Sequence, residues 1–454
     1  MAADIAIENE APAAPSVAAW FAPTTRNLAL WGGLVFIASL AAILVGIGSA
    51  KDIYFDEAWY VPTARAWLKS GEMLHQEHPP LGKLLIAFGI YLFGDQPVGW
   101  RAMSALFGAL TLFAVWLWAF ALMRSVPRAL WVAAITFLDA IVFVQARIAM
   151  LDIFLMAFSM LSLAFFTFSI KESAAPRRAF GYSLAMGACL GLAGACKWSG
   201  FFLLFGLLAI VLLIGLLRLW NARFADPRPD DFYAPEAAWT AGRTLLSFGV
   251  APFLAYFFVY IPQMLHERTI FEFAASHRRM FEILSGHSAD HPYMSLWWTW
   301  PALWRPVWYL FDIPGHQTAL WTAANTASAV VGLANPVVVF AGEAAILIAL
   351  WRWLARRELD AMIVAVAFFA QWLPWAVNPK GLEFSYYFYP SILCLGPALG
   401  LAVFREPRPW RTAAAWAFLA LSAAAFVFFL PVLAAGIGVS PEAFTARVWL
   451  PSWR

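Results

Sequence analysis

Charged residues are scarce in this chain of 454 residues: Lys, Arg, Asp and Glu make up 13% of it, whereas 63% is hydrophobic. A soluble protein of this length carries roughly twice that share of charge. The composition therefore excludes an ordinary soluble domain and indicates a polytopic membrane protein. The net charge of +3 is small, and we expect no nucleic-acid partner.

Three other features are missing: a metal-ligand spacing among the cysteines, an internal repeat, and the basic start of a signal peptide. The three cysteines, Cys189, Cys196 and Cys394, lie in or beside apolar runs without the spacing of metal ligands, and we interpret them as core residues. No internal repeat is visible, which argues against a transporter built from repeated halves. The acidic, Ala- and Pro-rich start of the chain lacks the basic residues of a signal peptide, and we expect residues 1–27 to form a disordered cytoplasmic tail.

Apolar runs of about 20 residues, the length that crosses a bilayer, recur along the chain. They predict an all-α fold with about eleven membrane spans. The expected spans cover residues 28–50, 97–123, 129–146, 151–170, 179–196, 199–219, 243–261, 335–354, 361–377, 384–404 and 412–434. We divide the chain into an N-terminal catalytic module (28–261), a long external loop (262–334) and a C-terminal membrane module (335–454).

Basic residues gather in alternate short loops, which by the positive-inside rule are cytoplasmic. The N-terminus is then cytoplasmic, and we expect a multi-pass protein of the plasma (inner) membrane. All seven histidines fall in two external loops, 51–96 and 262–334. Within the first loop, Tyr60, Ala64 and Trp67 recur at helical spacing and predict an amphipathic helix lying in the interface. The run 84–93 is too short to span the membrane and predicts a second interfacial or re-entrant helix.

Two adjacent carboxylates, Asp56 and Glu57, follow the first apolar run. Acids at the C-terminal end of a helix oppose its dipole, so a solvated helix end explains them poorly. Asp56 could instead cap the N-terminus of the interfacial helix that follows. The other interpretation, which we favour, is that the pair carries acid–base chemistry at the external membrane surface.

Several cations lie on the external side, against the charge rule. They are Lys83, Arg101, Arg147, Lys197, Arg305 and Lys380. Any one of them alone could be a residue that extends its charge to the interface. Together, at the edge of an apolar bundle, they indicate an anion site, with phosphate as the natural ligand.

The second external loop is dense in aromatic residues around His291, Tyr293 and Trp297. Such residues anchor proteins at the membrane interface, which is their more common use, or stack on sugar rings. A metal is a further alternative, because His75 with His78, or His287 with His291, has a spacing compatible with ligation. Neither pair forms a complete ligand set.

Ordered motifs of the chain resemble those of the protein O-mannosyltransferases, membrane glycosyltransferases of the C-type (GT-C) fold, and in particular their short bacterial members. The similarity covers roughly residues 28–434. Its motifs are Asp56-Glu57, His78-Pro79-Pro80-Leu81-Gly82-Lys83, Arg101 at the head of the second span, Arg147 to Asp152, Lys197-Trp198-Ser199-Gly200, His291-Pro292-Tyr293, Arg305-Pro306-Val307-Trp308-Tyr309, Asn335-Pro336 and Phe384 to Pro390. The large external insert of the eukaryotic members is missing.

The resemblance implies transfer of a sugar, mannose in this family, from a polyprenyl-phosphate donor to a Ser/Thr hydroxyl of a protein, with inversion. Asp56 is then the general base, supported by Glu57. The donor phosphate is bound by Arg101, Arg147, Lys197 and Lys380. Substrates are positioned by His78, Lys83, Asp152, His291, Tyr293, Trp297 and Arg305. The leaving group is already a stable anion, so no metal is obligatory, although a divalent ion and a dimeric assembly are left open.

Two rival functions compete with this interpretation. A polyprenyl-phosphate-sugar transferase acting on a lipid or glycan, such as the aminoarabinose transferases of lipid A, would share the acidic pair. A transporter of a lipid-linked substrate would place its charges near the middle of the bilayer, whereas here they gather at the external face.

Overall fold

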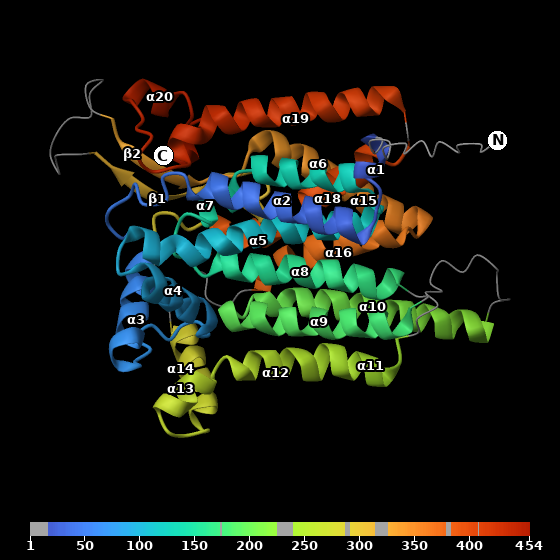
Figure 1. The fold of residues 1–454 in the computed structure, drawn as a ribbon, viewed down its shortest axis with the longest axis horizontal. Coiled ribbons are helices and arrows are strands. Elements are labelled where there is room, and N and C mark those ends of the chain that lie inside the picture. Colours follow the sequence, from blue (N-terminus) through green and yellow to red (C-terminus); the bar gives the residue numbers. More distant parts are fainter. Residues whose placement is uncertain are drawn as a thin grey trace, which may run out of the picture.

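A computed structural model describes residues 17–172, 175–224, 239–286, 291–313, 326–377, 383–406 and 408–454. Long parallel and antiparallel helices form its body (Figure 1). The first half contains α1 (Val17–Trp20), α2 (Thr25–Leu44), α3 (Glu57–Ser70), α4 (Leu81–Phe93), α5 (Pro97–Met123), α6 (Val126–Leu138), α7 (Ile141–Gln145), α8 (Asp152–Lys171), α9 (Pro176–Cys196) and α10 (Gly200–Phe224).

The second half contains α11 (Ala241–Leu245), α12 (Ala251–Phe258), α13 (Ile261–His266), α14 (Glu272–Gly286), β1 (Val307–Asp312), β2 (Ser328–Gly332), α15 (Pro336–Arg356), α16 (Leu359–Trp372), α17 (Tyr389–Ile392), α18 (Leu395–Val403), α19 (Pro409–Phe429) and α20 (Pro441–Thr445). Within the described residues, ten helical segments are long and apolar enough to cross a membrane. The predicted all-α membrane fold is therefore confirmed.

The third predicted span, 129–146, differs from the others because it is broken. α6 ends at Leu138, Ala140 adopts a left-handed backbone (φ 78°), and α7 then continues the crossing. Asn335, which precedes α15, holds the break: its side-chain amide donates to the carbonyl of Leu138, and its backbone N–H donates to the carbonyl of Asp139. Neither short helix alone has the length of a span.

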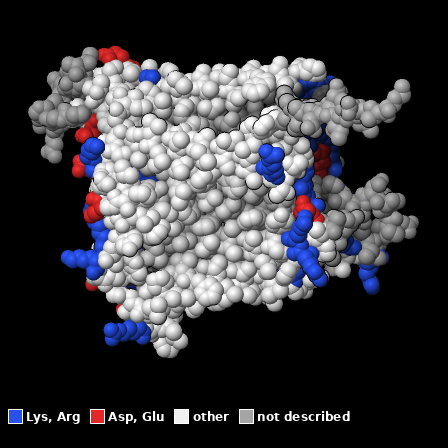
Figure 2. All heavy atoms as spheres, in the orientation of Figure 1, with Lys and Arg blue, Asp and Glu red and all other residues white. Residues whose placement is uncertain are grey.

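The bundle has two different ends. At one end, which we call the site end (left in Figure 1), lie α3, α4, α13, α14, the antiparallel pair β1–β2 and the C-terminus. At the other end, the basic end, lie the start of α2 and the short connections between helices. On the face drawn in Figure 2, charged side chains gather near these two ends, and the broad band between them shows almost none. A band of this kind suits the hydrocarbon layer of a membrane.

Burial separates central from peripheral helices. The most apolar window of α8 is 83% buried and that of α5 67%, whereas the windows of α2 and α19 are only 17% and 22% buried. α2 and α19 therefore expose most of their side chains to the membrane. Residues 17–27, which we assigned to the N-terminal tail, include α1. Asn27 donates to the carbonyls of Ala19 and Ala22, which ties α1 to the start of α2.

Candidate active site

Asp56 stands immediately before α3, on a backbone turn made by its neighbour Phe55. Phe55 has a positive φ of 50°, which for a bulky residue is a strained conformation found mainly where packing enforces it. Its ring packs against Tyr309 (centroids 4.7 Å apart) and Tyr386 (5.9 Å). The Asp56 side chain makes no capping hydrogen bond to α3, which removes the capping explanation of this residue.

The Asp56 carboxylate is partly buried, and no hydrogen bond or ion pair within the described ranges engages it. Burial is the main cause that raises its pKa, to about 7. The nearby Lys197 ammonium lowers that pKa, and the Asp152 and Glu77 carboxylates raise it. An unpaired carboxylate with a pKa near neutrality can accept a proton from a substrate.

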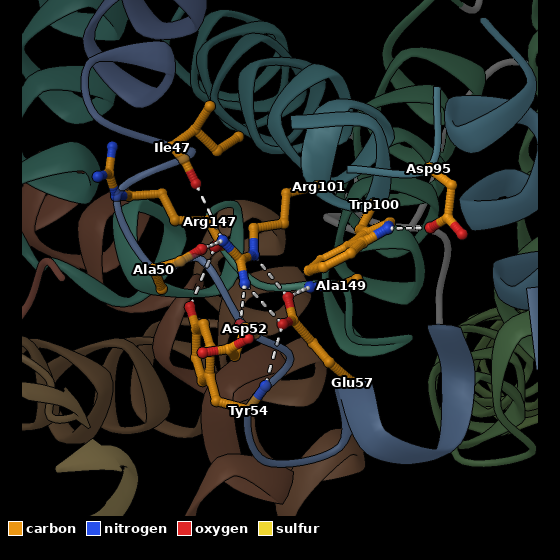
Figure 3. Close-up of polar contacts among 10 residues, drawn as sticks. All are labelled: Ile47, Ala50, Asp52, Tyr54, Glu57, Asp95, Trp100, Arg101, Arg147 and Ala149. Atoms are coloured by element: carbon orange, nitrogen blue, oxygen red, sulfur yellow. Dashed lines mark hydrogen bonds and ion pairs between the residues drawn. The ribbon is translucent and has the colours of Figure 1, made fainter. Parts of the chain in front are cut away.

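Glu57, the neighbouring acid, is fully buried and fully engaged. Its two oxygens accept from Arg101, at 2.7 Å from Nε and 2.8 Å from Nη2. They also accept backbone N–H bonds from Ala149 (2.8 Å) and Tyr54 (3.2 Å) (Figure 3). One carboxylate therefore joins the first loop, α5 and the turn before α8.

The guanidinium of Arg101 uses all five of its N–H groups. Besides the two bonds to Glu57, it donates to the backbone carbonyls of Ile47 (3.2 Å), Ala50 (2.8 Å) and Asp52 (3.1 Å). Figure 3 shows these carbonyls arranged around the guanidinium. Arg101 was predicted to bind the donor phosphate, but in this structure it has no N–H left for a ligand.

Arg147 also contacts the first external loop, but its guanidinium has different hydrogen-bond partners from that of Arg101. Its Nη1 donates to the carbonyls of Ile43 (2.6 Å) and Val45 at the end of α2, and the Tyr54 hydroxyl donates to its backbone carbonyl. Its Nε and Nη2 make no hydrogen bond within the described residues. Arg147 and Arg101 line one small cavity of about 10 Å³, which is roughly the size of a single water.

Lys197, at the end of α9, forms a buried ion pair with Asp152, the first residue of α8. The Nζ lies 2.8 Å from both carboxylate oxygens. It also lies 5.4 Å from the ring centre of Tyr386 and 5.6 Å from that of Tyr387. Tyr386 also contacts Phe55, the residue before Asp56. Phe55, Phe384, Tyr386 and Tyr387 thus form one set of contacting rings, here called the aromatic wall, beside both the ion pair and Asp56.

Lys83, at the start of α4, holds the chain that precedes it. Its buried ammonium donates to the backbone carbonyls of His75 and His78, both at 2.6 Å. Burial lowers the pKa of Lys83 to about 7. The His78 side chain lines a small cavity with residues of α13 and α14, among them Gln263. His78 and Lys83 thus build the loop beside the site, on the side facing α14.

The aromatic stretch of the second external loop packs against residues of the C-terminal module beside the site. The exposed His291 ring packs edge-on against Phe384 (5.1 Å), which stacks on Tyr386 (5.3 Å). Tyr293 lies beside His291 (5.8 Å), and Trp297 packs on Trp372 of α16 (5.6 Å). These contacts bring the His291–Tyr293 turn to the same aromatic wall.

Arg305 and Lys380 were also predicted to belong to the site. Arg305 is partly buried, and its Nε has no hydrogen-bond partner in the described part of the chain. Lys380 lies outside the described residues, as does His287. Among the residues that the structure describes, no group of three or more His, Cys, Asp or Glu side chains is arranged to hold a metal ion.

The sequence assigned no catalytic or binding role to Tyr386 and Tyr387 of the aromatic wall, or to Tyr60 of α3. The buried Tyr60 hydroxyl has its pKa raised by burial first and then by the charges of Asp56 and Asp152. A signal was present, because Tyr386 and Tyr387 belong to the motif Phe384 to Pro390. Nothing in the sequence paired that motif with a residue more than 300 positions earlier.

Comparison with known proteins gives a family match over most of the chain. The family described as "Dolichyl-phosphate-mannose-protein mannosyltransferase" matches residues 33–100 and 95–267. The "C-terminal four TMM region of protein-O-mannosyltransferase" matches residues 272–453. Together the two matches include Asp56, Lys197 and Tyr386.

Curated relatives agree with the family match. A polyprenol-phosphate-mannose–protein mannosyltransferase of Mycolicibacterium smegmatis is 28% identical, over 93% of this chain and 93% of its own length. Proteins of the same name from Mycobacterium tuberculosis (27% identical, 93% and 91% covered) and Corynebacterium glutamicum (26%, 98% and 96%) are also similar.

Solved structures show the same fold. A yeast (S. cerevisiae) protein O-mannosyltransferase complex, Pmt1-Pmt2 bound to the sugar donor, matches with a TM-score of 0.78 at 15% identity, over 95% of this chain and 94% of that chain. ArnT of Cupriavidus metallidurans bound to undecaprenyl phosphate matches with a TM-score of 0.58 at 18% identity, over 89% of this chain and 65% of that chain. Both matches support the GT-C architecture.

Proposed function

The chain belongs to the dolichyl-phosphate-mannose-protein mannosyltransferase family and is a membrane glycosyltransferase, and we propose that it transfers mannose from a polyprenyl-phosphate donor to a Ser/Thr hydroxyl of a protein with Asp56 as general base. The names of the curated relatives support this donor and a protein acceptor. The observation that carries the role of Asp56 is its partly buried carboxylate without a partner, beside the fully paired Glu57.

In the proposed reaction the acceptor oxygen attacks the anomeric carbon of the donor from the face opposite the phosphate. The new glycosidic bond forms as the bond from carbon to phosphate oxygen breaks, so the anomeric centre inverts. The hydroxyl proton passes to the Asp56 carboxylate, and the polyprenyl phosphate leaves as an anion. A pKa near 7 leaves Asp56 basic enough to accept that proton while part of the population is ionised.

We propose that Glu57 and Arg101 support this step without touching the substrate. Their ion pair closes the loop that carries Asp56 onto α5 and onto the turn of Ala149. The five engaged N–H groups of Arg101 favour a positioning role over direct contact with the donor phosphate. Because the pair is closed off from water, it fixes the position of Asp56 firmly.

For the phosphate itself, Arg147 and Lys197 are the better candidates. The Nε and Nη2 of Arg147 match the forked geometry of a phosphate, and Lys197 lies on the same aromatic wall as Asp56. Cations at these places stabilise the charge that develops on the leaving group. Lys380 and Arg305 stay predictions for this role, and Asp152 positions Lys197 through the ion pair.

We further propose that His291, Tyr293 and Trp297 border the acceptor side of the site, with Tyr386 as a stacking surface for the sugar. The basic end of the bundle is then cytoplasmic, by the positive-inside rule, and the site end faces the outside of the plasma membrane. No metal is obligatory in this scheme, since the leaving group is already a good anion. Full transfer in the presence of a chelator would support that point.

The test is a transfer assay with the purified full chain, polyprenyl-phosphate mannose and a Ser/Thr-containing peptide. We expect mannosyl-peptide by mass spectrometry and the loss of that product in Asp56→Asn. Asp52→Asn is the matched control, because Asp52 is an exposed acid of the same loop. Transfer to a lipid acceptor but not to the peptide would replace the protein acceptor, and full activity of Asp56→Asn would exclude Asp56 as the base.

A further inference from the structure

A long apolar groove runs along the membrane-facing side of the bundle, starting at the basic end and far from Asp56. It consists of two adjoining cavities of about 490 and 530 Å³. Leu130 and Ala134 of α6 and Leu419 of α19 line both cavities, so the two are continuous. Their combined volume reaches the upper end of the ~300–1,000 Å³ found for ligand pockets.

The packing of three helices explains the groove. α2 and α19 both pack on α6, and small residues of α2 such as Ala38 and Ala42, with Ala134 of α6, leave space between them. From Arg128 to Leu138 the floor is roughly 15 Å long at 1.5 Å per residue. α2 and α19 are the least buried of the spans. The groove therefore opens toward lipid and can be filled from the bilayer.

At the mouth of the groove lies the guanidinium of Arg128. It faces the ring of Phe404 (5.9 Å from its centre), and Trp131 and Trp416 line the same cavity. No hydrogen bond or ion pair reaches Arg128 from any residue described in the structure. A cation at the edge of an apolar cavity is costly unless an anion pairs with it.

A second arginine near this mouth is also incompletely paired. Arg411, at the start of α19, lies one helical turn before Ala415, a residue of the cavity wall. Its Nε and Nη1 are buried without a hydrogen-bond partner among the described residues, and its Nη2 is 3.8 Å from Glu406. The Thr412 hydroxyl lies at the same end of the cavity. The mouth is thus cationic and polar, and the groove behind it is apolar.

We propose that this groove binds one anionic glycerophospholipid, with an acyl chain along α6 and the headgroup phosphate on Arg128. The length and apolar lining fit a hydrocarbon chain, and the unpaired guanidinium at one end fits a phosphate. Anionic lipids are abundant in the leaflet that faces basic protein ends. The site lies at the opposite end of the bundle from Asp56, so its occupant is separate from the sugar donor and the proposal is independent of the transfer reaction.

Lipid retention tests the proposal. The full chain in mild detergent is incubated with phosphatidylglycerol or phosphatidylcholine, and the bound lipid is counted by native mass spectrometry. We expect one phosphatidylglycerol per chain, held roughly tenfold more tightly than phosphatidylcholine. Arg128→Gln should reduce phosphatidylglycerol binding to the level of phosphatidylcholine. Ala134→Phe, which fills the groove and leaves the charge, should abolish binding of both lipids.

Two residues at the basic end of the bundle, outside the groove, provide matched controls. Arg356→Gln changes an exposed arginine with no ion pair within the described residues, and Ala414→Phe adds a ring to the exposed face of α19; both should bind lipid as the unmodified chain does. The proposal would be overturned if Arg128→Gln and Ala134→Phe both retained phosphatidylglycerol as well as the unmodified chain does. A preference for polyprenyl phosphate, competition by inorganic phosphate alone, or a lipid-free dimer that Ala134→Phe separates would also overturn it.

Discussion

The carboxylate of Glu57 and the guanidinium of Arg101 form a two-point ion pair, 2.7 and 2.8 Å long, in which neither residue is exposed to solvent. Removing one partner of a buried pair leaves an uncompensated charge and costs about 3–5 kcal/mol. We expect Glu57→Gln or Arg101→Gln to lower the melting temperature in detergent sharply and to abolish transfer. Arg65→Gln is the control: it breaks a half-exposed pair with Asp95, worth about 0–1 kcal/mol.

The pH dependence of transfer should report the ionisation of Asp56. Its pKa is raised to about 7, and a general base acts only when ionised. We therefore expect kcat/KM to rise with pH through a midpoint of about 7. Lys197→Met removes the cation that lowers this pKa, so its midpoint should move to higher pH while its rate falls. A flat profile between about pH 5 and about pH 8 would contradict the assignment.

The same raised pKa predicts that Asp56 destabilises the folded state. Between its ordinary pKa of 3.8 and about 7, the folded chain binds more protons than the unfolded chain, so the stability of the protein falls as pH rises through that window. Asp56→Asn should stabilise the protein by about 1–2 kcal/mol above neutral pH, because one pKa unit is worth about 1.4 kcal/mol and solvent contact screens part of it. Thermal unfolding at several pH values measures the gain, and Asp52→Asn should show none.

We propose that the donor phosphate binds the Nε and Nη2 edge of Arg147, which makes no hydrogen bond within the described residues, while its Nη1 holds the end of α2. A charge-assisted hydrogen bond contributes about 1.5–3 kcal/mol. Arg147→Gln should therefore lower kcat/KM for the polyprenyl-phosphate donor by about 10–100-fold, mostly through weaker donor binding. Titration with the donor measures this directly. Unchanged donor affinity, with Arg65→Gln also unchanged, would remove Arg147 from the phosphate site.

Lys83 should behave as a structural clamp with its own pH signature. Its pKa is lowered to about 7 by burial, so from about pH 7 upward the unfolded chain binds more protons and the stability of the protein rises with pH. Lys83→Met leaves the carbonyls of His75 and His78 without a donor and should cost about 1–3 kcal/mol for each. It should also abolish that rise. Proteolysis of the loop 71–80 measures the loosening, with the exposed Lys69→Met as control.

The membrane architecture was predictable because a bilayer imposes a simple length rule. Runs of about 20 apolar residues identified the spans, and helical spacing at Tyr60, Ala64 and Trp67 identified α3. The break at Ala140 was not predictable. Its run is as apolar as the others, and the interruption depends on Asn335, almost 200 residues away. The strand pair β1–β2 was also missed, since the whole stretch 262–334 was interpreted as an external loop.

The residue types of the candidate site were predictable from the sequence. The pairing of each cation with a particular acid was less predictable. Charged residues outside the predicted cytoplasmic loops stand out, so Asp56, Arg101, Arg147 and Lys197 could be selected as candidates from the sequence. Which cation pairs with which acid is set by the packing of helices. Glu57 and Arg101, and likewise Asp152 and Lys197, are more than 40 positions apart. For that reason the sequence could not separate engaged cations from free ones.

The paired charges lie in the first half of the sequence, and this position has a consequence for how the chain enters its membrane. Glu57, Arg101, Asp152 and Lys197 all belong to the first 197 residues, whereas Tyr386 and Tyr387 are synthesised almost 200 residues later. The costly ions can therefore neutralise one another among the early helices, before the ribosome has completed the second half. The aromatic wall then closes over a set of charges that is already balanced. These four charges therefore need not enter the lipid unpaired.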